Sequence, residues 1–224
     1  MSNKKKEPEL PPQDLMPESD LPPDADIEER FNDFWKKNGP SIFGGIAFGA
    51  VIVVGIQLFQ YFADKKEQGI RDEFAAATTV EEKQQFVDEH SSHQLAALAQ
   101  LQLADARFEE DKFQEAADLY AESAKVFEDP VLVSRALLGQ GISLVQAGSI
   151  ESGQGLLEAV ALDAQTLDQT RGEAAFHLAV SQWEGGDAQK ALATSDLILQ
   201  LSSAQLWVFR ANILRERLNA ELGQ

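Results

Sequence analysis

The chain has 224 residues, with 37 acidic against 19 basic side chains, a net charge of −18 at pH 7, and no cysteine. So acidic a surface would repel phosphate, which argues against nucleic-acid binding. The lack of cysteine excludes disulfides and a thiol nucleophile, and it fits an oxidising compartment, although cytosolic domains can lack cysteine too.

The first forty residues hold seven of the eight prolines and ten acidic against six basic side chains. Residues 1–26 have too few apolar side chains to form a core, so we predict a disordered tail. Residues 27–39 place Phe31, Phe34 and Trp35 in an amphipathic pattern. This pattern predicts a short helix at the membrane surface, which ends before Pro40.

The next 22 residues, 41–62, carry no charged side chain. At about 1.5 Å per residue, a helix of this length spans roughly 33 Å and crosses the hydrocarbon of a bilayer. A signal-peptide core is shorter and lies nearer the N-terminus. We therefore predict one transmembrane helix over 41–62. Gly45 and Gly49 form a GxxxG motif, which favours a contact with another membrane helix or simply reflects the usual glycine content of such helices.

Residues 63–224 read as one helical domain with an internal repeat. Three segments align at offsets of 37 and 38 residues, and each has a small residue in its first helix, a polar turn and a second small residue in its second helix. Small residues let two antiparallel helices cross closely. The three pairs are Ala104 with Ala116, Gly141 with Gly153, and Ala179 with Ala191.

This pattern resembles the tetratricopeptide repeat (TPR), a helical hairpin that stacks into a solenoid. We predict an all-α, TPR-like solenoid with repeats at about 97–130, 134–168 and 172–203; a plain helical bundle is the alternative. A last helix over 204–222 caps the open end. Its predicted apolar stripe comprises Leu206, Phe209, Ile213, Leu214 and Leu218.

Two stretches carry a resemblance over residues 27–224: "IEERFNDFWKKNGP" before the uncharged run and "EEKQQFVDEHSSHQLAALAQLQLADARFEEDKFQEAADLY" after it. Together they resemble the YfgM-like family of ancillary SecYEG translocon subunits. The resemblance implies a bacterial inner-membrane protein with a cytoplasmic N-terminus and a periplasmic TPR-like domain. The charges do not fix this orientation, because three Lys/Arg flank each side of the run within about twenty residues.

TPR solenoids bind proteins on the concave face, which the first helix of each hairpin lines. Our groove candidates are Phe108, Glu109, Arg135, Ile142, Phe176, Trp183 and Glu184. The alternative for the apolar candidates is simple core packing. Phe108 and Trp183 occupy equivalent places beside a turn and are the predicted partner anchors, whereas Arg135 is predicted to meet a carboxylate.

The sequence offers little to an enzyme. Its histidines are His90, His93 and His177, and it has no GxSxG, phosphate-binding glycine loop or HExxH motif. The spacing of His90 and His93 would allow shared metal ligation, but no third ligand is evident. We expect no catalytic residue, metal or cofactor, and we interpret His177 as a partly buried or groove residue.

The favoured hypothesis is a membrane-anchored adaptor that, by the resemblance, binds SecYEG and a periplasmic chaperone or emerging polypeptides. One alternative is a membrane-tethered TPR scaffold for envelope assembly or cell division. Another is a homo-oligomeric structural protein, joined through the membrane helix or by stacked solenoids.

Overall fold

The computed structural model describes residues 51–223. The predicted tail 1–26, the predicted helix 27–39, and Gly45 and Gly49 all lie outside these residues. Of the described residues, 51–64 belong to one unit and 65–223 to a second.

In the first unit, residues 51–64 are helical, and the large apolar side chains between Val51 and Phe62 are exposed. A search of the described residues finds no helix that is both long enough and apolar enough to span a bilayer. Because the predicted membrane helix 41–62 begins outside the described residues, it stays a prediction.

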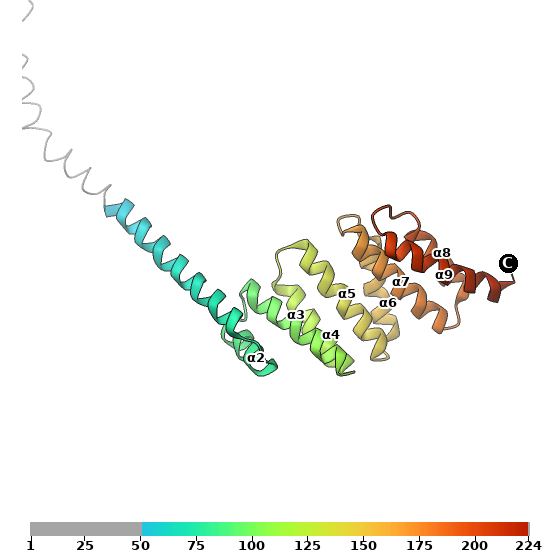
Figure 1. The fold of residues 1–224 in the computed structure, drawn as a ribbon, viewed down its shortest axis with the longest axis horizontal. Coiled ribbons are helices and arrows are strands. Elements are labelled where there is room, and N and C mark those ends of the chain that lie inside the picture. The colour runs from blue at the N-terminus through green and yellow to red at the C-terminus, as the bar shows by residue number, and fades with distance from the viewer. Residues whose placement is uncertain (1–50, 224) are drawn as a thin grey trace, which may run out of the picture. The chain divides into compact units, whose positions relative to one another are not determined.

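The second unit is all-helical, as predicted, and opens with a helical segment over residues 65–76. Figure 1 shows the helices that follow in chain order, with α3 to α8 forming three antiparallel hairpins and α9 at the far end. Their bounds are α2 Val80–Glu89, α3 Gln94–Glu109, α4 Phe113–Val126, α5 Pro130–Gln146, α6 Ile150–Leu162, α7 Asp168–Glu184, α8 Ala188–Ile198 and α9 Gln205–Leu222.

Local signals fix where two of these helices begin. At the start of α2, the Glu82 N–H donates to the Thr79 hydroxyl at 3.2 Å, and the Glu82 carboxylate accepts from the Thr79 N–H at 2.9 Å. This reciprocal capping box satisfies two N–H groups that have no partner inside the helix. At the start of α5, Asp129 accepts from the Val131 N–H at 2.9 Å, and Pro130 occupies the first turn, where a missing N–H costs nothing.

The turns inside the three hairpins have the same geometry. Asp111, Gly148 and Gly186 have positive φ angles of 58°, 86° and 86°. In each turn, the next residue donates its N–H to the carbonyl five residues earlier, at 2.9 Å in all three cases. This left-handed ending closes the last turn of the first helix and reverses the chain. The repeat that the sequence shows is therefore also a repeat of backbone conformation.

The small residues lie where each hairpin's helices cross. The alanines of the first and third pairs are fully buried. In the second hairpin, a Cβ added to Gly153 would lie 2.7 Å from the Gly141 carbonyl oxygen and 2.7 Å from the Val145 side chain. Since real Cβ atoms do not approach so closely, the α5–α6 crossing needs glycine at 153.

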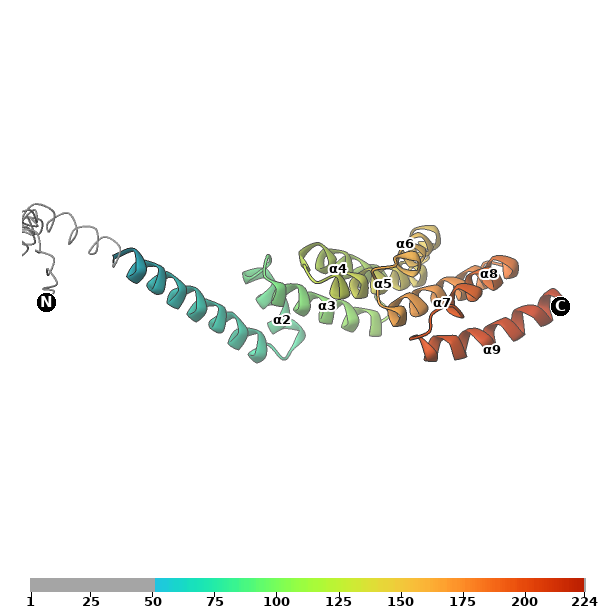
Figure 2. The ribbon, with the colours of Figure 1, turned by 90° about the horizontal axis from the view of Figure 1, so that it is seen from above.

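Apolar clusters run through the stack from one hairpin to the next. Figure 2 shows α9 beside α7 and α8, where it ends the solenoid. The predicted stripe of α9 is only partly correct. Leu214 and Leu218 are buried, but Trp207 and Ala211 complete the buried face, whereas Leu206, Phe209 and Ile213 are exposed. Rotating the helix to bury the large Trp207 ring turns those three side chains outwards.

Two glycines of α6 test the crossing. We expect Gly153→Ala to lower the free energy of unfolding by about 1–3 kcal/mol, because it overpacks the contact with α5. Gly155 has open space around its Cβ position, so Gly155→Ala is expected to raise that free energy by roughly 0.5–1 kcal/mol. Urea unfolding of both variants checks this, and equal effects would contradict the close crossing.

Candidate protein-binding groove

A groove of about 440 Å³ lies along the first helices of the three hairpins, α3, α5 and α7. It brings together four predicted groove residues, Phe108, Glu109, Arg135 and Ile142. The full lining is Asp105, Phe108, Glu109, Tyr120, Arg135, Gly139, Ile142, Glu173 and His177. The groove therefore lies on the helices expected to line a concave face.

Tyr120 of α4 reaches the groove by crossing the backbone of α5 at Gly139. A Cβ on Gly139 would lie 2.7 Å from the Tyr120 ring, so only glycine fits there. The Tyr120 hydroxyl donates to Asp105 Oδ1, and burial, with the adjacent Asp105 carboxylate, raises the pKa of Tyr120. Tyr120 thus stays a neutral donor and fixes the Asp105 side chain.

Arg135 was predicted to meet a carboxylate, and within the structure it meets that of Asp105. Its guanidinium lies 3.4 Å from Asp105 Oδ1, the same oxygen that accepts from Tyr120. The contact joins α3 to α5 across the groove. Both charged side chains are about half exposed, so the pair contributes little to stability and instead orients the two groups.

Phe108 and Ile142 provide apolar contact surface. The Phe108 ring packs edge-on against the Phe113 ring, with centroids 5.2 Å apart. Ile142 packs against the core cluster of the second and third hairpins. Each side chain is only partly buried, so part of its apolar surface lines the groove.

The α7 wall carries Glu173 and His177, one turn apart. Burial raises the pKa of the Glu173 carboxyl, and the charges of Arg135 and Arg210 partly oppose this rise. Burial lowers the pKa of His177, and the positive charge of Arg210 lowers it further. The His177 ring, with its centroid 6.1 Å from that of Trp207, is therefore neutral at pH 7.

Three predicted groove residues lie outside this groove. Trp183 packs in the cluster between α7, α8 and α9, and its indole N–H donates to Glu221 of α9 at 2.6 Å. Phe176 packs against the Trp207 ring at 5.5 Å. Glu184 is exposed and lines a separate cavity of about 40 Å³. Phe108 and Trp183 hold equivalent places beside their turns, as predicted, but their surroundings differ because α9 covers the third hairpin where Trp183 lies.

The groove lining also includes Tyr120, Gly139 and Glu173, which were not predicted there. For Glu173 a signal exists. Glu173 precedes the small residue Ala179 by six positions, as Arg135 precedes Gly141. The two residues therefore hold equivalent places on successive first helices, and predicting Arg135 in the groove implied Glu173 as well.

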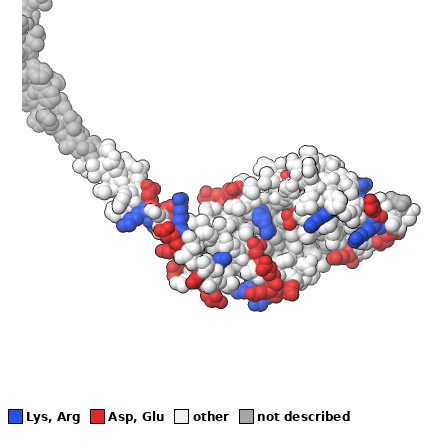
Figure 3. Space-filling view, viewed as in Figure 1, with Lys and Arg blue, Asp and Glu red and all other residues white. Residues whose placement is uncertain are grey.

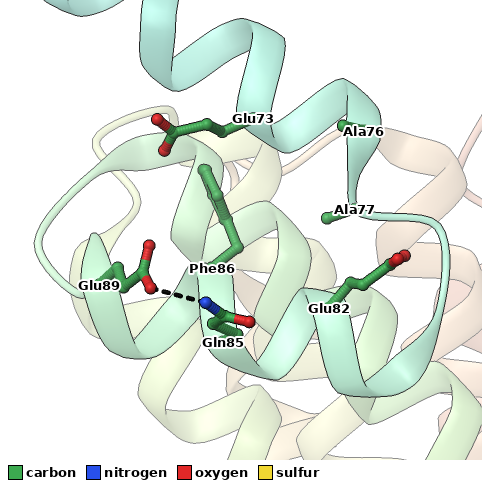
Figure 4. Close-up of a pocket in the computed structure, with 7 residues that line it drawn as sticks. All are labelled: Glu73, Ala76, Ala77, Glu82, Gln85, Phe86 and Glu89. Carbon is green, nitrogen blue, oxygen red and sulfur yellow. Dashed lines mark hydrogen bonds between the residues drawn. The ribbon is translucent and has the colours of Figure 1, made fainter.

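A second cavity, of about 230 Å³, lies between the segment 65–76 and α2. Figure 4 shows Phe86 within it, surrounded by acidic side chains, with Gln85 donating to Glu89. Its lining comprises Glu73, Ala76, Ala77, Glu82, Gln85, Phe86 and Glu89. Phe74 and Ala77 pack with Phe86 in one apolar cluster, and Glu82 is used by the capping box of α2. We therefore interpret this cavity as part of the packing between the segment 65–76 and α2.

The two neighbouring histidines bind different carboxylates. His90 Nε2 lies 2.7 Å from Glu73, and His93 Nε2 lies 3.0 Å from Glu67, while His93 Nδ1 caps α3 by accepting from the Leu95 N–H. Ligand atoms of Glu73, Glu89 and His90 lie within 4.8 Å of one another. The Glu73 carboxylate and the His90 ring are already hydrogen-bonded to each other, and this contact holds the segment 65–76 against the end of α2. The expectation of no metal stays a prediction.

A protein-family model described as a tetratricopeptide repeat-like domain matches residues 32–174. Neither the curated proteins nor the solved structures contain a match to this chain. The matched residues include the first two hairpins and the beginning of α7.

His177 makes a pH-dependent contribution to stability. Its pKa is lower in the folded chain than its ordinary 6.5, so below pH 6.5 the unfolded chain binds more protons. The contribution of His177 to the free energy of unfolding is complete above pH 6.5 and is lost as the pH falls through the pKa of the folded chain. The total loss is about 1.4 kcal/mol for each unit by which the pKa values of His177 in the folded and unfolded chain differ. Urea unfolding at pH 7.5 and 5.5 should show a smaller loss for His177→Gln than for the wild type; equal losses would contradict it.

Proposed function

The chain belongs to the tetratricopeptide repeat-like domain family, and from this we propose that its helical domain is an adaptor that binds a protein partner in the groove between α3, α5 and α7. Domains of this family generally mediate protein–protein contacts and are usually interaction modules rather than enzymes. The observation that carries the proposal is the groove itself, where Phe108 and Ile142 present apolar surface beside fixed polar groups.

The groove supports this function because it combines the two kinds of surface that protein interfaces use. Aromatic and aliphatic side chains supply most of the binding energy, and polar groups set the orientation of the ligand. The Tyr120–Asp105–Arg135 contacts hold the polar groups in place before a partner arrives. A partner therefore does not need to order them on binding.

We further propose that residues 41–62 anchor the adaptor in a bacterial inner membrane, with the N-terminus cytoplasmic and the helical domain periplasmic. Support comes from the uncharged run in the sequence and from the nine large apolar side chains of residues 51–62, each at least 46% exposed. By the resemblance to YfgM-like subunits, the proposed partners are SecYEG and a periplasmic chaperone or an emerging chain.

Photo-crosslinking from the groove tests the adaptor proposal. A photoreactive residue replacing Glu109, at the groove, should capture partners in native membranes, and one replacing Glu151, exposed on α6, should not. Mass spectrometry then identifies the partners: translocon subunits or chaperones would support the specific proposal. Equal capture from both positions would contradict the groove, and consistent absence of translocon subunits would point to a scaffold of another kind.

Phe108 and Trp183 separate binding from packing. Phe108→Ala should reduce crosslinking from position 109 by about tenfold, as expected for an aromatic anchor worth roughly 1.4 kcal/mol. Because Phe108 also packs on the first-hairpin cluster, the measurement is made where circular dichroism shows the variant to be folded. Trp183→Ala should instead lower the free energy of unfolding by about 2 kcal/mol, because it removes packing between α7 and α9. Loss of capture in a fully stable Trp183→Ala chain would reverse these roles.

Protease treatment of spheroplasts tests the orientation. The helical domain should be digested in intact spheroplasts, because the proposal places it outside the inner membrane. A cytoplasmic marker protein that stays intact controls for lysis. Survival of the domain until the cells are broken would refute the proposed topology.

A further inference from the structure

The groove holds more negative than positive charge. Three carboxylates line it, Asp105, Glu109 and Glu173, against one guanidinium, that of Arg135. Asp105 is already bound to Arg135 and Tyr120. Among residues 51–223, neither Glu109 nor Glu173 has an ion pair or a side-chain hydrogen bond. Two carboxylates, on α3 and α7, are thus left for a ligand.

The nearby positive charges have other contacts. The Arg135 guanidinium faces Asp105, and the Arg210 guanidinium lies over the Trp207 ring, 4.8 Å from its centroid. Neither forms an ion pair with Glu173 at 4.0 Å or less in the described part of the chain. Burial of Glu173 without such a partner raises its pKa. A cationic ligand would supply the missing interaction and favour the ionised carboxylate.

Apolar surface lies beside these carboxylates. Phe108 is in the same turn of α3 as Glu109, and Ile142 lies on α5, between the helices that carry the two acids. Figure 3 shows that charged side chains are interspersed with extensive uncharged surface on one face of the domain. A ligand for this groove therefore needs a positive charge and an apolar side chain close together.

We infer that the groove binds a polypeptide segment in which a Lys or Arg stands next to an aliphatic or aromatic residue. Basic residues of the segment pair with Glu109 or with Glu173, and the apolar side chain packs against Phe108 and Ile142. Charge-assisted hydrogen bonds to carboxylates are stronger than neutral ones, so the basic residue determines which segments bind. This inference rests on the proposed adaptor function and adds the chemistry of the partner.

Peptide binding to the full-length chain in detergent micelles tests this. Fluorescent ten-residue peptides carry a central Leu-Phe flanked by Lys, and matched peptides carry Gln or Glu in place of Lys. Fluorescence anisotropy should show the Lys peptides binding at least about tenfold more tightly than the Gln peptides, with the Glu peptides weakest. Raising the salt concentration should reduce this preference, because salt screens exposed charges.

Matched carboxylate variants locate the effect. Glu173→Gln and Glu109→Gln should each weaken Lys-peptide binding several-fold and leave Gln-peptide binding unchanged, whereas Glu158→Gln, exposed on α6, should have no effect. An equal loss in all three variants would overturn the inference, because it would indicate diffuse attraction to an acidic surface.

Two further outcomes also decide the matter. Binding that depends on Phe108 but not on peptide charge would overturn the inference and leave the adaptor function intact. Absence of binding by every peptide would overturn the inference as well. The adaptor function is then judged separately, by crosslinking from position 109, where the probe removes one carboxylate and leaves Phe108, Ile142 and Glu173 in place.

Discussion

Two helices can approach backbone to backbone only where neither carries a bulky side chain, and this chain meets that condition once in every hairpin. At the crossing of α5 and α6, the Gly141 carbonyl occupies the space that a Cβ on Gly153 would need. Close crossings hold each second helix against its first helix. The first helices are then free to lie side by side and form a continuous face.

The groove depends on a second close approach of the same kind. Gly139 lets the Tyr120 ring pass over α5, which places its hydroxyl beside Asp105. Asp105 also accepts a hydrogen bond from the Arg135 guanidinium. The Tyr120 side chain of α4 therefore orders polar groups on both α3 and α5. Packing between hairpins thus determines the electrostatics of the site, because it decides which groove charges are paired and which are left for a ligand.

The periodicity of the sequence was sufficient to predict the helical hairpins. The positions of the small residues were sufficient to predict where the helices of each hairpin cross. They also predicted Phe108 and Ile142 on the groove, because their places relative to the small residues are local properties of one helix. Trp183 could not be placed in this way, since its environment depends on where α9 packs. The sequence of α9 has apolar residues on two faces, and only tertiary contacts select the face with Trp207 as the buried one.

Because of the position of α9, the groove is shorter than the solenoid that carries it. Three hairpins form the solenoid, but α9 covers Phe176 and Trp183 of the third hairpin. This hairpin therefore contributes only the N-terminal half of α7 to the groove. Adding a hairpin at this end would first require α9 to leave, which would expose Trp207 and Leu218. The length of the groove is therefore set by the terminal helix and not by the number of repeats.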